Sequence, residues 1–129
     1  MYGHLNNAVY YQLFDTVING WLAEHVGGSP VDAPVQGVVA ESSCRFLAEV
    51  GFPDLVVVGL RVERLGNSSV TYALGLFRGG PEPTLAALGR WVHVYIDTRA
   101  RRSVPIPSPI REALTTLLPP DGSPAEELA

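Results

Sequence analysis

The stretch that decides the fold is MYGHLNNAVYYQLFDTVINGWLAEHV, residues 1–26. Over residues 7–26 apolar side chains recur every three or four positions, which predicts a helix with a wide apolar face. The apolar positions are Val9, Tyr10, Leu13, Phe14, Val17, Ile18, Trp21 and Leu22. Asn6 or Asn7 is a natural N-cap, and Gly27 supplies the stop. A face this wide predicts that the rest of the chain covers the helix.

Four strand-like segments and a second helix follow a turn-rich linker at 29–36. The predicted strands, rich in β-branched and aromatic residues, are 37–48, 54–65, 68–78 and 85–97. Gly66-Asn67 and Gly79-Gly80-Pro81 stand between strands at hairpin positions, so neighbouring strands are predicted to be antiparallel. A short helix is predicted at 109–118.

The order of elements predicts an α+β fold, in which an antiparallel meander of four long strands wraps around the first helix. Strands of this length favour a strongly curved sheet. The domain is predicted to span 1–118, and the Pro/Gly/Glu-rich tail 119–129 to be disordered.

Composition narrows the class of protein. The chain has 129 residues and a net charge of −4, which disfavours nucleic acid as a partner. Its one cysteine, Cys44, excludes an internal disulfide and fits a reducing compartment. Neither a membrane-spanning apolar run nor a signal peptide is visible, so we expect a cytoplasmic protein without a membrane partner.

The opening motif carries a resemblance to a known family. Gly3, His4, Asn6, Asn7 and Tyr10 match the Gly-His-x-Asn-Asn-x-x-Tyr part of a signature. It resembles that of hot-dog fold acyl-CoA thioesterases of the 4-hydroxybenzoyl-CoA thioesterase family. The segments 64–69, 93–97 and 101–107 also resemble this family. The resemblance runs from residue 2 to about 118 and implies the hot-dog fold, whose first strand precedes the motif.

The same resemblance implies where the catalytic carboxylate comes from. In the family an aspartate, acting as nucleophile or general base, lies three residues before the glycine. Here that position is immediately before Met1. We expect a start that is misassigned or trimmed, with the aspartate upstream; the competing explanation is a chain that has lost this chemistry.

Roles for the motif residues follow from the resemblance. The backbone N–H near Asn7, at the helix N-terminus, would polarise the thioester carbonyl, and His4 and Asn7 would orient the acyl group or a water. The plainer reading of these residues is local capping of the backbone. The implied substrate-binding residues are Gly3, Asn6, Tyr10, Tyr11, Ser68, Ser69 and Arg102.

Three further residues are weaker candidates. Glu41, flanked by small residues, is a possible internal base, although a solvent-facing strand glutamate is the simpler reading. Asp15 either reaches a neighbour across a dimer interface or is exposed. Cys44 is better explained as a buried structural thiol than as a nucleophile. No Cys/His spacing indicates a metal site.

The resemblance also implies partners. The substrate would be an acyl-CoA, with coenzyme A as part of the substrate and no separate cofactor. The cluster Arg99, Arg101 and Arg102 would meet its phosphates, with Arg102 favoured. A homodimer or a dimer of dimers is expected. The alternatives are a non-catalytic acyl-thioester-binding protein and a hot-dog hydratase or dehydratase.

Overall fold

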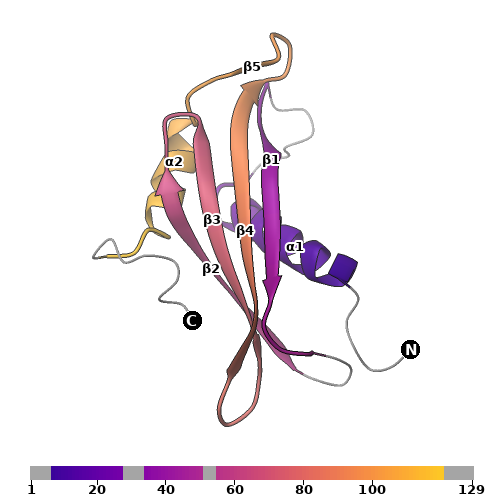
Figure 1. Cartoon of the computed structure of the whole chain (residues 1–129). Coiled ribbons are helices and arrows are strands. Elements are labelled where there is room, and N and C mark those ends of the chain that lie inside the picture. Colours follow the sequence, from indigo (N-terminus) through magenta and orange to yellow (C-terminus); the bar gives the residue numbers. More distant parts are fainter. Residues whose placement is uncertain (1–6, 28–33, 51–54, 121–129) are drawn as a thin grey trace.

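A computed structural model describes residues 7–27, 34–50 and 55–120 (Figure 1). The elements, in chain order, are α1 (Asn7–His25), β1 (Val35–Phe46), β2 (Val56–Leu65), β3 (Ser69–Arg78), β4 (Thr84–Asp97), β5 (Arg102–Ser103) and α2 (Ser108–Thr115). Both predicted helices and all four long strands are therefore confirmed. β1 starts inside the segment predicted as a linker, and the two-residue β5 was not predicted. Asn6, one of the two predicted N-caps, lies outside the described residues.

The strand order is β1-β4-β3-β2, with β5 paired to the end of β4 and every pair antiparallel. The predicted meander is confirmed for β2, β3 and β4 but is wrong for β1, which pairs with β4 and not with β2. The physical reason is the connection from Phe46 to Val56, which is too long for a tight hairpin turn. β1 can therefore reach the free side of β4.

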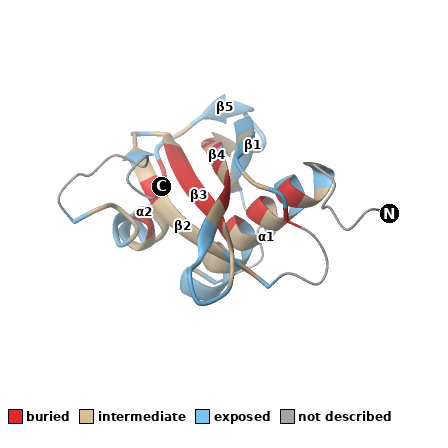
Figure 2. Ribbon diagram, turned by 60° about the horizontal axis from the view of Figure 1, so that its bottom comes forward, coloured by how far each residue is buried: buried red, intermediate tan, exposed pale blue. Residues whose placement is uncertain are grey.

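The hydrophobic core lies between α1 and one face of this sheet, which we call the inner face. Tyr10, Phe14 and Ile18, one helical turn apart, are the buried residues of α1. Phe14 meets Trp91 of β4 edge-to-face, with ring centroids 5.6 Å apart. Figure 2 shows the buried band running along α1 and through the centre of the sheet. Alternate residues of β3, Val70, Tyr72, Leu74 and Leu76, are fully buried on this face.

The turns explain how these elements are held. Gly27 ends α1 with φ 78°, a left-handed conformation that glycine adopts without strain. The predicted β2–β3 hairpin is closed by the Gly66 N–H, which donates to the Ser69 carbonyl at 2.8 Å. The Arg111 guanidinium of α2 donates to the carbonyls of Gly66 and Asn67 at 2.6 and 2.9 Å. This ties α2 to the hairpin and fixes that end of the sheet.

None of the described helices is long and apolar enough to cross a membrane.

Candidate functional site

The first candidate site is the N-terminal end of α1. The helix begins at Asn7, so the backbone N–H groups of its first turn have no partner within the helix. The predicted residues Gly3, His4 and Asn6 lie outside the described residues, and the side chain of Asn7 is likewise not described. What the structure does place is the start of the helix itself, at the β1 side of the sheet (Figure 1).

The aromatic residues of the first helical turns divide into core and surface. Tyr10 is 4 % exposed and packs edge-to-face on Phe46, with ring centroids 4.9 Å apart. Phe14 is fully buried. Tyr11 is 37 % exposed and tilts against Trp91 at 5.2 Å. Of the two tyrosines predicted to bind substrate, Tyr11 is therefore the one that a ligand at the surface can contact within a single chain.

Burial raises the pKa of two titratable groups in this region, Cys44 and Tyr10. Desolvation raises the pKa of the Cys44 thiol to about 11, so the thiol is protonated at neutral pH and is a poor nucleophile. Desolvation also raises the pKa of Tyr10, and the nearby Cys44 adds to this. Cys44 lies half-buried against the core, which agrees with the predicted structural thiol.

The structure does not bring Glu41 to this end of α1. A register shift between Val39 and Glu41 leaves Ala40 as an extra residue in β1. Val39 pairs with the inward-facing His93, whereas Glu41 pairs with Val92, which faces the opposite side of the sheet. The bulge therefore turns Glu41 to the face away from α1, where its side chain is exposed.

Ser68, Ser69 and Arg102 lie at the other end of the sheet. Ser69 pairs with Val94, whereas Phe46, next to Tyr10, pairs with Ala87. At about 3.3 Å per residue, this places Ser69 about 23 Å along β4 from the level of Phe46 and Tyr10. Within one chain, the residues implied for the nucleotide and those implied for the thioester are separate groups.

A tight turn displays the predicted arginine cluster. The carboxylate of Asp97 accepts hydrogen bonds from the backbone N–H groups of Arg99 and Ala100, at 2.9 and 2.8 Å. These hydrogen bonds lower the pKa of Asp97, with a smaller contribution from Arg102. Arg101 has φ 55°, an uncommon conformation for a residue with a side chain. The turn therefore holds three exposed guanidinium groups on a backbone fixed by its own hydrogen bonds.

A buried polar pair lies deeper in the core. His93 is 3 % exposed, and its ring meets that of Tyr72 edge-to-face at 5.2 Å. His93 Nε2 and the Tyr72 hydroxyl are buried, and no residue that the structure describes forms a hydrogen bond with either atom. Burial lowers the pKa of His93, and the negative charge of Asp15 on α1 acts in the opposite direction. His93 therefore packs within the core, and Asp15 lies close enough to act on it electrostatically.

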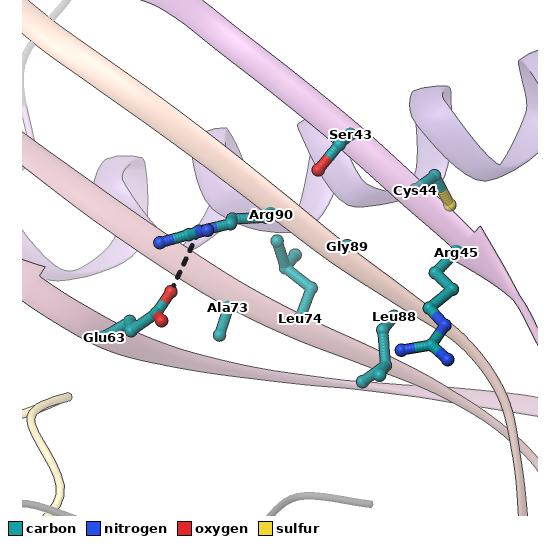
Figure 3. A pocket seen from close by; sticks show the side chains of 9 residues that line it. All are labelled: Ser43, Cys44, Arg45, Glu63, Ala73, Leu74, Leu88, Gly89 and Arg90. Atoms are coloured by element: carbon teal, nitrogen blue, oxygen red, sulfur yellow. Dashed lines mark ion pairs between the residues drawn. The ribbon is translucent and has the colours of Figure 1, made fainter. Parts of the chain in front are cut away.

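The sheet face opposite α1, which we call the outer face, carries a cavity that the sequence did not predict (Figure 3). Its lining residues are Ser43, Cys44, Arg45, Glu63, Ala73, Leu74, Leu88, Gly89 and Arg90. Arg90 Nε lies 3.1 Å from a Glu63 carboxylate oxygen. Within the described part of the chain, no group of three or more His, Cys, Asp or Glu side chains could hold a metal ion.

The geometry defines the class of protein: one long helix packed across a curved antiparallel sheet of this order is a hot-dog fold. A family model described as the thioesterase superfamily matches residues 2–84. The chain belongs to the thioesterase superfamily. No curated protein sequence matches it.

Solved structures of other proteins are similar to this chain in fold. The PA5185 protein of Pseudomonas aeruginosa strain PAO1 superposes with a TM-score of 0.83 and 47 % identity, over 91 % of this chain and 81 % of that one. The PA2801 protein of the same species gives a TM-score of 0.78 and 32 % identity, over 88 % and 86 %. A 1,4-dihydroxy-2-naphthoyl-CoA thioesterase from Synechocystis, 19 % identical with a TM-score of 0.79 over 92 % and 88 %, shares the fold.

Proposed function

We propose that this chain hydrolyses an acyl-CoA thioester to the free acid and coenzyme A, in the manner of the 4-hydroxybenzoyl-CoA thioesterase family. The observation that carries the proposal is the start of α1 at Asn7, directly after Gly-His-x-Asn, in a chain whose family match covers that motif. A helix N-terminus presents free N–H groups and a partial positive charge, which suit the oxygen of a polarised thioester carbonyl.

In this mechanism the chain supplies positioning and electrostatic stabilisation. The N–H groups of the first turn stabilise the charge that develops on the carbonyl oxygen, while His4 and Asn7 orient the acyl group or the attacking water. The attacking group needs a carboxylate. In the family motif an aspartate three residues before the glycine supplies it; among the residues of this chain Glu41 is the alternative, although its side chain faces away from α1.

A second copy of the chain would complete the site. β1 is a sheet edge of 12 residues, and its surface includes the exposed apolar side chains of Val38, Val39 and Phe46. Pairing β1 with β1 of another copy around a two-fold axis buries these side chains and runs the two strands antiparallel. The start of one β1 then lies beside the end of the other.

That pairing brings the two separate groups of predicted residues together. Arg102 pairs with Asp97, and Val35 at the start of β1 pairs with the same residue. Phe46, at the end of β1, contacts Tyr10 of α1. Arg102 of the partner subunit therefore approaches the helix that holds the thioester, and guanidinium groups there suit the phosphates of coenzyme A.

The test is release of free thiol from aromatic and short, medium and long acyl-CoAs, by this chain and by a version extended upstream with an aspartate before Met1 and a first strand. Asn7→Ala is expected to lower kcat in the active form, whereas Asn19→Ala, an exposed asparagine of the same helix, is the matched control. Activity of the short chain that Glu41→Gln abolishes would instead assign the carboxylate to Glu41.

Two outcomes contradict the proposal. Binding of acyl-CoA without thiol release in either version indicates the non-catalytic alternative, and water addition to an unsaturated acyl-CoA with the thioester intact indicates a hydratase. The dimer is tested separately, by light scattering of the wild type and of Val39→Lys, which places charges on the edge. A wild type that remains monomeric refutes the two-copy site.

A further inference from the structure

The cavity on the outer face is separated from the proposed thioester site by the sheet itself. It has a volume of about 330 Å³, within the range of sites for small ligands. In Figure 3 α1 lies behind the strands, and the side chains of Arg45, Leu88 and Arg90 stand around the hollow. None of the residues that line this cavity has a proposed role in thioester hydrolysis.

The cavity forms because the short side chain of Ala73 lies between the long side chains of Arg61 and Arg90. Ala73 of β3 pairs with Arg90 of β4 and with Arg61 of β2, so its methyl group forms the floor between two arginines. Ala73 is 6 % exposed. Because its side chain is so short, Arg90 reaches across β3 to Glu63 on β2, and their ion pair forms one wall of the cavity (Figure 3).

The opposite wall carries the guanidinium of Arg45. Arg45 pairs with Leu88 and Ser43 pairs with Arg90, so the two arginines are diagonal neighbours on one face, about 7–8 Å apart. Arg45 is exposed, and within the part of the chain that the structure describes no ion pair engages it. Among the charged lining residues, Glu63 is the single acid against two arginines, so the cavity has net positive charge in a protein of net charge −4.

We propose that this cavity binds a small organic carboxylate with an apolar body. The carboxylate would accept hydrogen bonds from the Arg45 guanidinium and the Ser43 hydroxyl, and the body would cover Leu88 and Ala73. Guanidinium groups bind carboxylates through paired hydrogen bonds, and the apolar floor favours a ligand with hydrocarbon beside its charge. The proposal does not depend on the proposed thioesterase activity.

The experiment is an NMR titration of the ¹⁵N-labelled full chain with benzoate, inorganic phosphate and benzyl alcohol. Benzoate is expected to shift the amides of Ser43, Arg45 and Arg90 saturably in the millimolar range, and the other two probes, each lacking one of the two features, to bind more weakly. Arg45→Gln should weaken benzoate binding about fivefold, the loss expected for one exposed charge-assisted contact.

Two variants sharpen the test. Arg64→Gln removes an exposed arginine of β2 that does not line the cavity, and should leave benzoate binding unchanged. Ala73→Ile should abolish binding by filling the floor; its folding is checked from the dispersion of the same spectra.

Three results would overturn the proposal. Equal weakening by Arg45→Gln and Arg64→Gln would mean that only general positive charge is involved. Benzoate shifts confined to the first turns of α1 would place the ligand at the thioester site. Shifts at the cavity that follow protein concentration without ligand would make this face a contact between copies. None of these outcomes bears on thiol release, so the two proposals fail independently.

Discussion

Replacing Gly89 with alanine tests the packing that holds α1 on the sheet. A Cβ atom at this position would lie 2.7 and 2.8 Å from two ring atoms of Phe14 and 3.2 Å from Trp91. Contacts below 3.0 Å are not tolerated, and Phe14 is fully buried, so its ring has no free volume to move into. The extra methyl group must therefore displace α1 or force the ring out of its rotamer.

Overpacking of this kind costs about 1–3 kcal/mol of unfolding free energy. For a chain of this length each kcal/mol corresponds to about 3–5 °C in Tm, so Gly89→Ala is expected to lower Tm by about 3–15 °C. The assay is thermal unfolding followed by circular dichroism. The control is Gly20→Ala, where nothing lies within 4 Å of the new Cβ. That helical substitution should stabilise by about 0.5–1 kcal/mol.

A double variant separates overpacking from other effects of the alanine. Phe14→Leu removes the ring that the new methyl group strikes, so Gly89→Ala should cost less in the Phe14→Leu background than in the wild type. Equal costs in both backgrounds, or a Gly89→Ala protein as stable as the wild type, would refute the reasoning that Gly89 is needed for the close approach of α1.

Three further predictions concern single groups. Burial lowers the pKa of His93 from its ordinary 6.5, so the unfolded chain binds a proton more readily than the folded chain. Stability therefore falls as the pH drops below 6.5. Tm of the wild type should decrease between pH 7.5 and 5.5 more than that of His93→Gln. At pH 8 about one Cys44 thiol in a thousand is ionised, given its pKa of about 11, so a thiol reagent should react slowly with the native chain and rapidly in urea. Arg101→Gly relieves a left-handed backbone at φ 55° and should raise the unfolding free energy by up to about 1 kcal/mol, measured by urea titration.

Each of these has a contradicting outcome. Parallel pH profiles for the wild type and His93→Gln would mean that His93 does not contribute to the acid sensitivity. Equal labelling rates of Cys44 in buffer and urea would show that its environment does not protect it. An Arg101→Gly chain less stable than the wild type would mean that the arginine side chain contributes more than the turn conformation costs.

The local elements could be predicted from the sequence, because each is specified by its own residues. The four-residue apolar repeat of α1 and the alternation of β3 lie within single segments, and Gly66-Asn67 marks its hairpin directly. The position of β1 beside β4 could not be predicted, because it depends on contacts between distant segments. β5, with two residues, is too short to show any periodicity.

The candidate site was less predictable for a related reason. Glu41 would face α1 in a regular strand, but the one extra residue at Ala40 reverses the direction of every side chain after it. The outer cavity depends on Ala73 of β3 standing between Arg61 and Arg90, which becomes visible only when the register is known. Residues grouped by one motif are predictable; residues grouped by strand pairing are not.

The pairing of β1 with β4 also sets the order in which the protein can fold during synthesis. α1 and β1 leave the ribosome first. Their partners in β4 follow roughly 40 to 60 residues later, since Val35 pairs with Asp97 and Phe46 pairs with Ala87. Synthesis proceeds at about 5–20 residues per second, so β1 stays unpaired for several seconds. During this time most of the sheet that covers the apolar side of α1 is also missing. The hairpin of β2 and β3 can form in that interval. Because β4 pairs with both β1 and β3, its synthesis allows the β2–β3 hairpin to join α1 and β1 in one step.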